Sequence, residues 1–153
     1  MERAITTTSR ILFLLILLTS CTVTLLAPYD EVTDQKTTEL HEKVLLQLNR
    51  WYSIYELDPD SSVLEYKNNF EFYNQSITTT EILLSRNQGQ EKNQIVIRQL
   101  DGLLKNLKDM KYIHQEDTIM DTVDVASFKR IFDVQLGAIQ KFQQVRKGTN
   151  KTE

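Results

Sequence analysis

Apolar residues recur at steps of three and four along most of the chain, which is the spacing of one face of an α-helix. The first such segment begins after Pro28, where Asp30, Thr33 or Asp34 can cap a helix. The segment ends at residues 58–62 (DPDSS), which stop one helix and provide caps for the next. Its predicted buried stripe consists of Leu40, Val44, Leu48, Trp51 and Tyr55.

The second and third segments have alternating steps of three and four, the mark of a heptad seam. The second ends within residues 86–90, where Gly89 breaks the pattern, and the third covers residues 91–113. We expect the second seam to consist of Val63, Tyr66, Phe70, Tyr73, Ile77, Thr80 and Leu84. The third consists of Val96, Leu100, Leu103, Leu107 and Met110.

The fourth segment, residues 122–146, has an apolar face that consists of Phe128, Phe132, Ile139 and Phe142. Residues 112–121 are polar and are predicted to form a loop that contains His114. Four amphipathic segments with short connections predict an all-α fold, an antiparallel up-down-up-down four-helix bundle over residues 30–147. A three-helix bundle with a detached first helix is the alternative. Four helices are favoured because Trp51 and Tyr55 in the first segment favour burial.

The amino-terminal residues have the pattern of an export signal. Arg3 and Arg10 precede eight apolar residues at 11–18, and small residues follow before Cys21. This apolar run is shorter than the roughly 20 residues that span a bilayer. We therefore predict a cleaved signal peptide at residues 1–20, a tether at residues 21–29 and a polar tail at residues 148–153. An uncleaved signal anchor, or an incidental Cys21 without any cleavage, are the alternatives.

The tetrapeptide Leu18-Thr19-Ser20-Cys21 resembles the lipobox of bacterial lipoproteins. The resemblance implies cleavage between Ser20 and Cys21, a diacylglyceryl thioether on the Cys21 sulfur, and a fatty acyl chain such as palmitate on the new amine. It places the domain on the periplasmic side of a membrane. In many Gram-negative lipoproteins an Asp directly after the cysteine is a signal for retention in the inner membrane. This chain has Thr22 at that position, so the resemblance favours the outer membrane.

A second resemblance covers most of the mature chain. Residues 28–34 (PYDEVTD) are similar to the opening of a family of helical Gram-negative lipoproteins without an established activity. In that family a long helix, a segment like Tyr66 and Phe72-Tyr73, and a Gln-Leu-Asp stretch like residues 99–101 follow. The resemblance implies the same helical architecture and the same membrane anchor, and it assigns no reaction.

Composition and motifs argue against several kinds of chemistry. Removing residues 1–20 changes the formal net charge from −3 to −4, and an acidic domain argues against nucleic-acid binding. Neither His41 nor His114 follows a Glu by three residues, so the di-iron bundle motif is absent and no metal or other cofactor is predicted. The sequence contains no Gly-x-Ser-x-Gly turn and no phosphate-binding glycine loop. We expect no enzymatic activity and identify no small-molecule substrate.

Two functional classes fit a helical domain held at a membrane by a lipid anchor. In the first, the domain binds an envelope protein partner or serves as its accessory subunit. In the second, it is a structural or protective envelope component, such as a lipoprotein carried by a phage or mobile element that blocks a surface receptor. A large exposed apolar patch would favour the first class.

Overall fold

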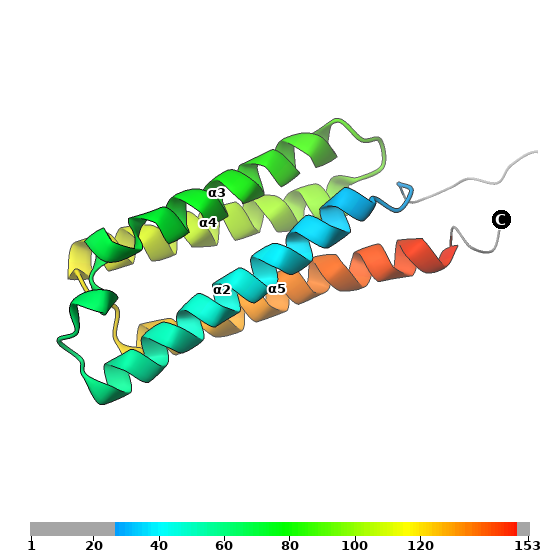
Figure 1. The fold of residues 1–153 in the computed structure, drawn as a ribbon. Helices are drawn as coiled ribbons and strands as arrows, with labels where there is room; N and C mark the ends of the chain where they lie inside the picture. The colour runs from blue at the N-terminus through cyan, green and yellow to red at the C-terminus, as the bar shows by residue number, and fades with distance from the viewer. Residues whose placement is uncertain (1–26, 150–153) are drawn as a thin grey trace, which may run out of the picture.

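The computed structural model describes residues 27–149, and this part of the chain is an all-α bundle (Figure 1). Its four long helices are α2 (Glu31–Leu57), α3 (Tyr66–Gln88), α4 (Gln94–Asp117) and α5 (Thr122–Thr149). A short 3-10 helix, η1 (Ser62–Leu64), precedes α3. Consecutive helices run in opposite directions, so the predicted antiparallel up-down-up-down arrangement is confirmed.

The helices pack as two pairs, α2 with α5 and α3 with α4, and these pairs meet through α2 with α3 and α4 with α5. We call the end that contains the start of α2, the α3–α4 connection and the end of α5 the proximal end. The distal end contains η1 and the α4–α5 connection (Figure 1). The detached first helix is wrong, because α2 packs on two helices and its Trp51 is only 1% exposed.

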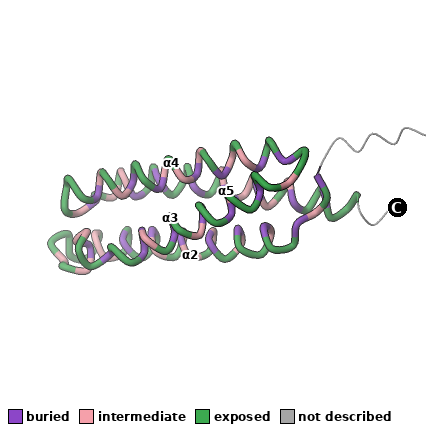
Figure 2. Tube along the Cα trace, turned by 90° about the horizontal axis from the view of Figure 1, so that it is seen from above, coloured by how far each residue is buried: buried purple, intermediate pink, exposed green. Residues whose placement is uncertain are grey.

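The buried apolar residues form one core cluster. Buried positions recur along each of the four long helices (Figure 2). The third predicted seam is confirmed in full, because all five of its residues on α4 are buried. The first is confirmed for four residues, and Tyr55 packs at the edge of the core. On α5, Phe128, Phe132 and Ile139 are buried and Phe142 is partly buried.

The predicted seam of α3 is confirmed in part. Tyr73 and Thr80 are buried, and Tyr66, Ile77 and Leu84 pack against the core. The prediction is wrong at Phe70, which is 48% exposed, whereas its neighbour Asn69 is buried. The side chain of Asn69 donates to the carbonyl oxygens of Val63 (2.7 Å) and Glu65 (2.9 Å), and its own oxygen accepts from the Trp51 indole (3.0 Å). A buried amide that makes these bonds carries little desolvation cost. The hydrogen bonds therefore turn a polar residue inward where the apolar pattern favoured Phe70.

Two boundaries also differ from the prediction. Helix α4 continues to Asp117, because residues 112–117 extend its last turns, and this places His114 inside the core rather than in a loop. Helix α5 continues to Thr149, two residues past the predicted end of the bundle. The signal peptide, Ser20, Cys21 and residues 21–26 of the tether lie outside the described residues. Within residues 27–149, no helix combines the length and apolarity needed to cross a membrane.

Candidate functional site

The proximal end is closed by the residues that precede α2. Ala27 is buried, and the ring of Tyr29 lies under the Lys147 ammonium at 5.2 Å while its hydroxyl donates to Asp34 (2.8 Å). Asp30 is the N-cap of α2 and accepts from the Val32 amide at 3.1 Å. The last residues of the predicted tether therefore pack against α2 and α5 instead of extending away from them.

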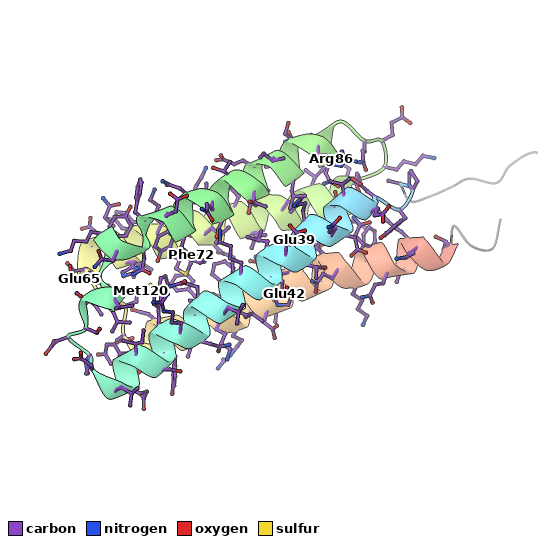
Figure 3. The ribbon with its side chains drawn as sticks, in the orientation of Figure 1. Glu39, Glu42, Glu65, Phe72, Arg86 and Met120 are labelled. Carbon is purple, nitrogen blue, oxygen red and sulfur yellow. The ribbon has the colours of Figure 1, made fainter. Side chains whose placement is uncertain are left out.

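Asp30 also joins α2 to the α3–α4 connection. Its carboxylate accepts two hydrogen bonds from the Arg86 guanidinium (2.7 and 3.0 Å) and one from Gln90 (2.8 Å). Thr33 donates a further hydrogen bond at 2.8 Å. Figure 3 shows Arg86 on the last turn of α3, beside the start of α2. This single carboxylate therefore joins the start of α2 to the end of α3 and to the α3–α4 connection.

The ionised form of Asp30 is strongly favoured. Burial alone opposes the charge, but the hydrogen bonds from Arg86, Thr33 and Gln90 outweigh that effect. Together they hold the pKa of Asp30 well below its ordinary value. The charge of Asp30 is therefore present at every physiological pH.

A row of buried amides continues inward from Asp30. The Asn87 side chain donates to the Thr33 hydroxyl (2.9 Å) and to the Leu83 carbonyl (2.8 Å). Asn93, which is fully buried before α4, donates to Asn87 and to Gln90 (3.1 Å). These bonds make the α3–α4 connection a polar, ordered part of the proximal end.

The distal core holds a second buried polar cluster. The His114 Nε2 is 2.6 Å from the Leu64 carbonyl oxygen, and its Nδ1 is 2.8 Å from the Tyr73 hydroxyl. The Trp51 ring meets the His114 ring edge to face at 5.0 Å. Every polar atom of this imidazole has a partner in the chain, so the cluster positions η1 and offers no free group for catalysis.

A groove opens between α2 and α5 on the outside of the bundle. It has a volume of about 460 Å³ and is lined by Asn49, Tyr52, Ser53, Ala126, Lys129, Arg130 and Asp133. This volume lies within the roughly 300–1,000 Å³ that ligand sites occupy. Beyond the groove, His41 joins the two helices, with Nε2 3.0 Å from Asp133 and Nδ1 3.1 Å from Gln140. The groove therefore lies along a helix pair that is fixed by hydrogen bonds.

These sites differ from what sequence reasoning singled out. Ser20 and Cys21, the predicted cleavage and lipidation residues, lie outside the described part of the chain. The structure does not bring the two histidines together, since His41 bridges α2 and α5 and His114 lies in the distal core. Across residues 27–149, no three His, Cys, Asp or Glu side chains are arranged to hold a metal ion.

The proximal residues Arg86, Gln90 and Arg146 were missed as a group. Arg86 and Gln90 stand in the segment that was read only as a helix break, and Arg146 stands near the end of the last segment. The one available signal was Asp30, which was predicted as a helix cap and has this role. Its ion pair joins residues 56 positions apart, which spacing along one helix cannot indicate.

A comparison of the chain with protein-family models, with characterised proteins and with solved structures finds no match.

Proposed function

We propose that the chain is an exported lipoprotein, anchored through Cys21 on the periplasmic side of a membrane, whose bundle binds an envelope protein partner in the α2–α5 groove. The outer membrane is the favoured site, and the proposed role is binding rather than catalysis. The partner, and not a nucleic acid or a small substrate, is the proposed ligand.

The packing of residues 27–30 supports an orientation in which the proximal end of the bundle faces the membrane. Only residues 22–26 separate Cys21 from the buried Ala27, and five extended residues reach about 18 Å at most. An anchor on Cys21 therefore keeps the proximal end close to the lipid. The distal end points away, and the groove faces sideways along the bundle, where a protein beside it can reach it.

The distribution of charge favours the same orientation. At the distal end, the charged residues of segments 56–65 and 116–124 are all acidic. The proximal end carries both signs, with Asp30, Glu31, Asp34 and Glu91 beside Arg86, Lys92, Arg146 and Lys147. A surface of anionic lipid therefore repels the distal end more strongly than the proximal one.

The single observation that carries the binding role is the exposure of apolar side chains on the helix pair that forms the groove. Large exposed apolar residues occur on all four helices, but most lie on α2 and α5. Those of α2 and α5 are Val32, Leu46, Tyr52, Leu57, Val123, Ile131, Val134 and Val145. Of this set only Tyr52 lines the groove, and the other residues are spread along the two helices. Aromatic side chains such as Tyr are frequent anchors of interfaces.

The experiment is site-specific photocrosslinking of the full chain in cells. We expect a photoreactive residue at Asn49 in the groove to give a discrete protein adduct, and one at Lys105 on the exposed face of α4 to give none. A second substitution, Arg130→Glu, reverses a groove charge and should remove the Asn49 adduct. Its matched control, Lys105→Glu, should leave that adduct in place.

Equal adduct yields from Asn49 and Lys105, or an Asn49 adduct that persists in Arg130→Glu, would contradict binding in the groove. The anchor is tested separately by mass spectrometry of the mature amino terminus and by membrane fractionation. We expect an acylated Cys21 at the mature amino terminus of wild type, and an unacylated chain that keeps residues 1–20 from Cys21→Ser. An unmodified Met1 would contradict the lipoprotein assignment.

A further inference from the structure

Arg146, near the end of α5, is a buried cation without a counter-ion of its own. The residue is 1% exposed, and none of its three guanidinium nitrogens has a hydrogen-bond partner in the described part of the chain. The guanidinium lies over the Phe142 ring, with its central carbon 4.4 Å from the ring centroid. A ring face attracts the charge but leaves the in-plane N–H groups unpaired.

Burying such a charge costs several kcal/mol unless it is paired and hydrogen-bonded. Burial lowers the pKa of Arg146, and the negative charge of Asp30 partly offsets that effect. The carboxylate of Asp30 is already bound by Arg86, Gln90 and Thr33. Two guanidinium groups therefore share one carboxylate, and an unmatched positive charge remains.

A second unpaired donor lies beside this charge. Gln143, one helical turn before Arg146, is fully buried, and its side-chain N–H₂ group has no partner among residues 27–149. Its amide oxygen faces the backbone N–H of Asp30 at 3.5 Å. Arg146 and Gln143 thus present unpaired N–H donors, a set that matches an acceptor-only anion.

A hollow lies beside this region. It has a volume of about 320 Å³, and its lining includes Tyr29, Asp30, Glu31, Arg86 and Gln90. Asp30 connects the two places, since it lines the hollow and its backbone N–H faces the Gln143 amide oxygen.

We propose that Arg146 and Gln143 form a binding site for a phosphate-type oxyanion at the proximal end of the bundle. The Arg146 guanidinium supplies the positive charge and several N–H donors in one plane, and the Gln143 amide supplies a further donor. The phosphodiester of a lipid headgroup and free inorganic phosphate share this chemistry. The site itself is independent of the groove and its partner, whereas the headgroup source rests on the proposed anchor.

The first test measures the full acylated chain in detergent by thermal unfolding, with inorganic phosphate compared with chloride at equal ionic strength. We expect Tm to rise with the logarithm of the phosphate concentration above Kd, by about 5 °C at ten times the Kd. Arg146→Met should abolish this rise. Arg98→Met is the matched control, because Arg98 is an exposed cation on α4 near the same end, and it should respond like wild type.

A second measurement follows Arg146 in the wild-type protein, and it uses the conservative variant Arg146→Lys only to identify the signal. The Nε–Hε NMR signal of Arg146 in wild type, identified by its loss in Arg146→Lys, should shift on titration with inorganic phosphate. The same shift in phosphatidylglycerol nanodiscs without added phosphate assigns the site to the headgroup, and a shift with inorganic phosphate alone assigns it to the free anion. A signal that moves in neither arm overturns the proposal, as does an Arg146→Met variant that phosphate stabilises as much as wild type.

Discussion

Tyr73 on α3 and His114 on α4 are hydrogen-bonded to each other inside the core, with the Tyr73 hydroxyl 2.8 Å from His114 Nδ1. The other nitrogen of the ring faces the Leu64 carbonyl, which can only accept, so Nε2 carries the proton. Nδ1 of the neutral ring then accepts from Tyr73. The structure thus contains a neutral histidine that both neighbours satisfy.

This arrangement predicts that the domain loses stability in mild acid. Burial lowers the pKa of His114 below its ordinary value, against the opposing effect of its bond to Leu64. The unfolded chain therefore binds more protons than the folded one between the lowered pKa and about 6.5. Stability is complete above pH 6.5 and falls as the pH drops through that interval. Urea unfolding at pH 7.5 and pH 5 measures the difference.

The matched control is His114→Gln, which keeps an N–H donor for Leu64 and cannot titrate. Carboxylates change protonation in both proteins, so their contribution cancels when the two differences are subtracted. We expect the variant to lose less stability than wild type between the two pH values. An equal loss in the two proteins would assign the acid sensitivity to groups other than His114.

The hydrogen bonds of Asp30 predict that its replacement lowers the stability of the domain. Replacing it by Ala removes the α2 cap and four side-chain hydrogen bonds, and we expect the free energy of unfolding to fall by about 2 kcal/mol. Arg86→Met should cost about 0.5–1 kcal/mol, because 44% of the Arg86 side chain is exposed. Urea unfolding provides both values, and Glu31→Ala, an exposed neighbour, should change little. Equal losses of unfolding free energy in Asp30→Ala and Glu31→Ala would show that the Asp30 hydrogen bonds do not stabilise the proximal end.

The sequence predicted the bundle well because apolar burial drives the fold and repeats with the helix. The α4 stripe shows this most clearly, since its five apolar residues are spaced regularly and all are buried. Trp51 on α2 separates four helices from three, because its large side chain needs a core around it. Position along one helix is sufficient for this kind of inference.

The buried polar residues could not be predicted in the same way. Asn69, His114 and Arg146 are all polar types that are usually exposed, and each is buried. Asn69 and His114 are compensated by bonds to residues on other elements, which no periodicity records. Since the candidate sites are made of such residues, their composition became visible only once the helices were placed side by side.

The exposure of Phe70 predicts very different costs for replacing two aromatic residues of the predicted α3 seam. Tyr73 is fully buried, so Tyr73→Ala should cost about 3–5 kcal/mol through the cavity it leaves. Phe70 is half exposed, its ring meets the Tyr66 ring edge to face, and the Lys111 ammonium lies over it. Phe70→Ala should therefore cost about 1 kcal/mol or less. Similar losses of stability in the two variants would mean that Phe70 is buried, as the heptad pattern of the sequence predicted.

Gly137 predicts a gain in stability. It lies in the middle of α5, and a Cβ added there meets no atom within 4 Å. Glycine inside a helix costs about 0.5–1 kcal/mol relative to alanine, because the unfolded glycine has more backbone freedom to lose. Gly137→Ala should therefore raise the free energy of unfolding by about that amount. Gly148→Ala is the matched control, since its Cβ also meets nothing but its position in the last turn reduces the benefit. A loss of stability in Gly137→Ala would mean that α5 approaches another group more closely at this position than the structure describes.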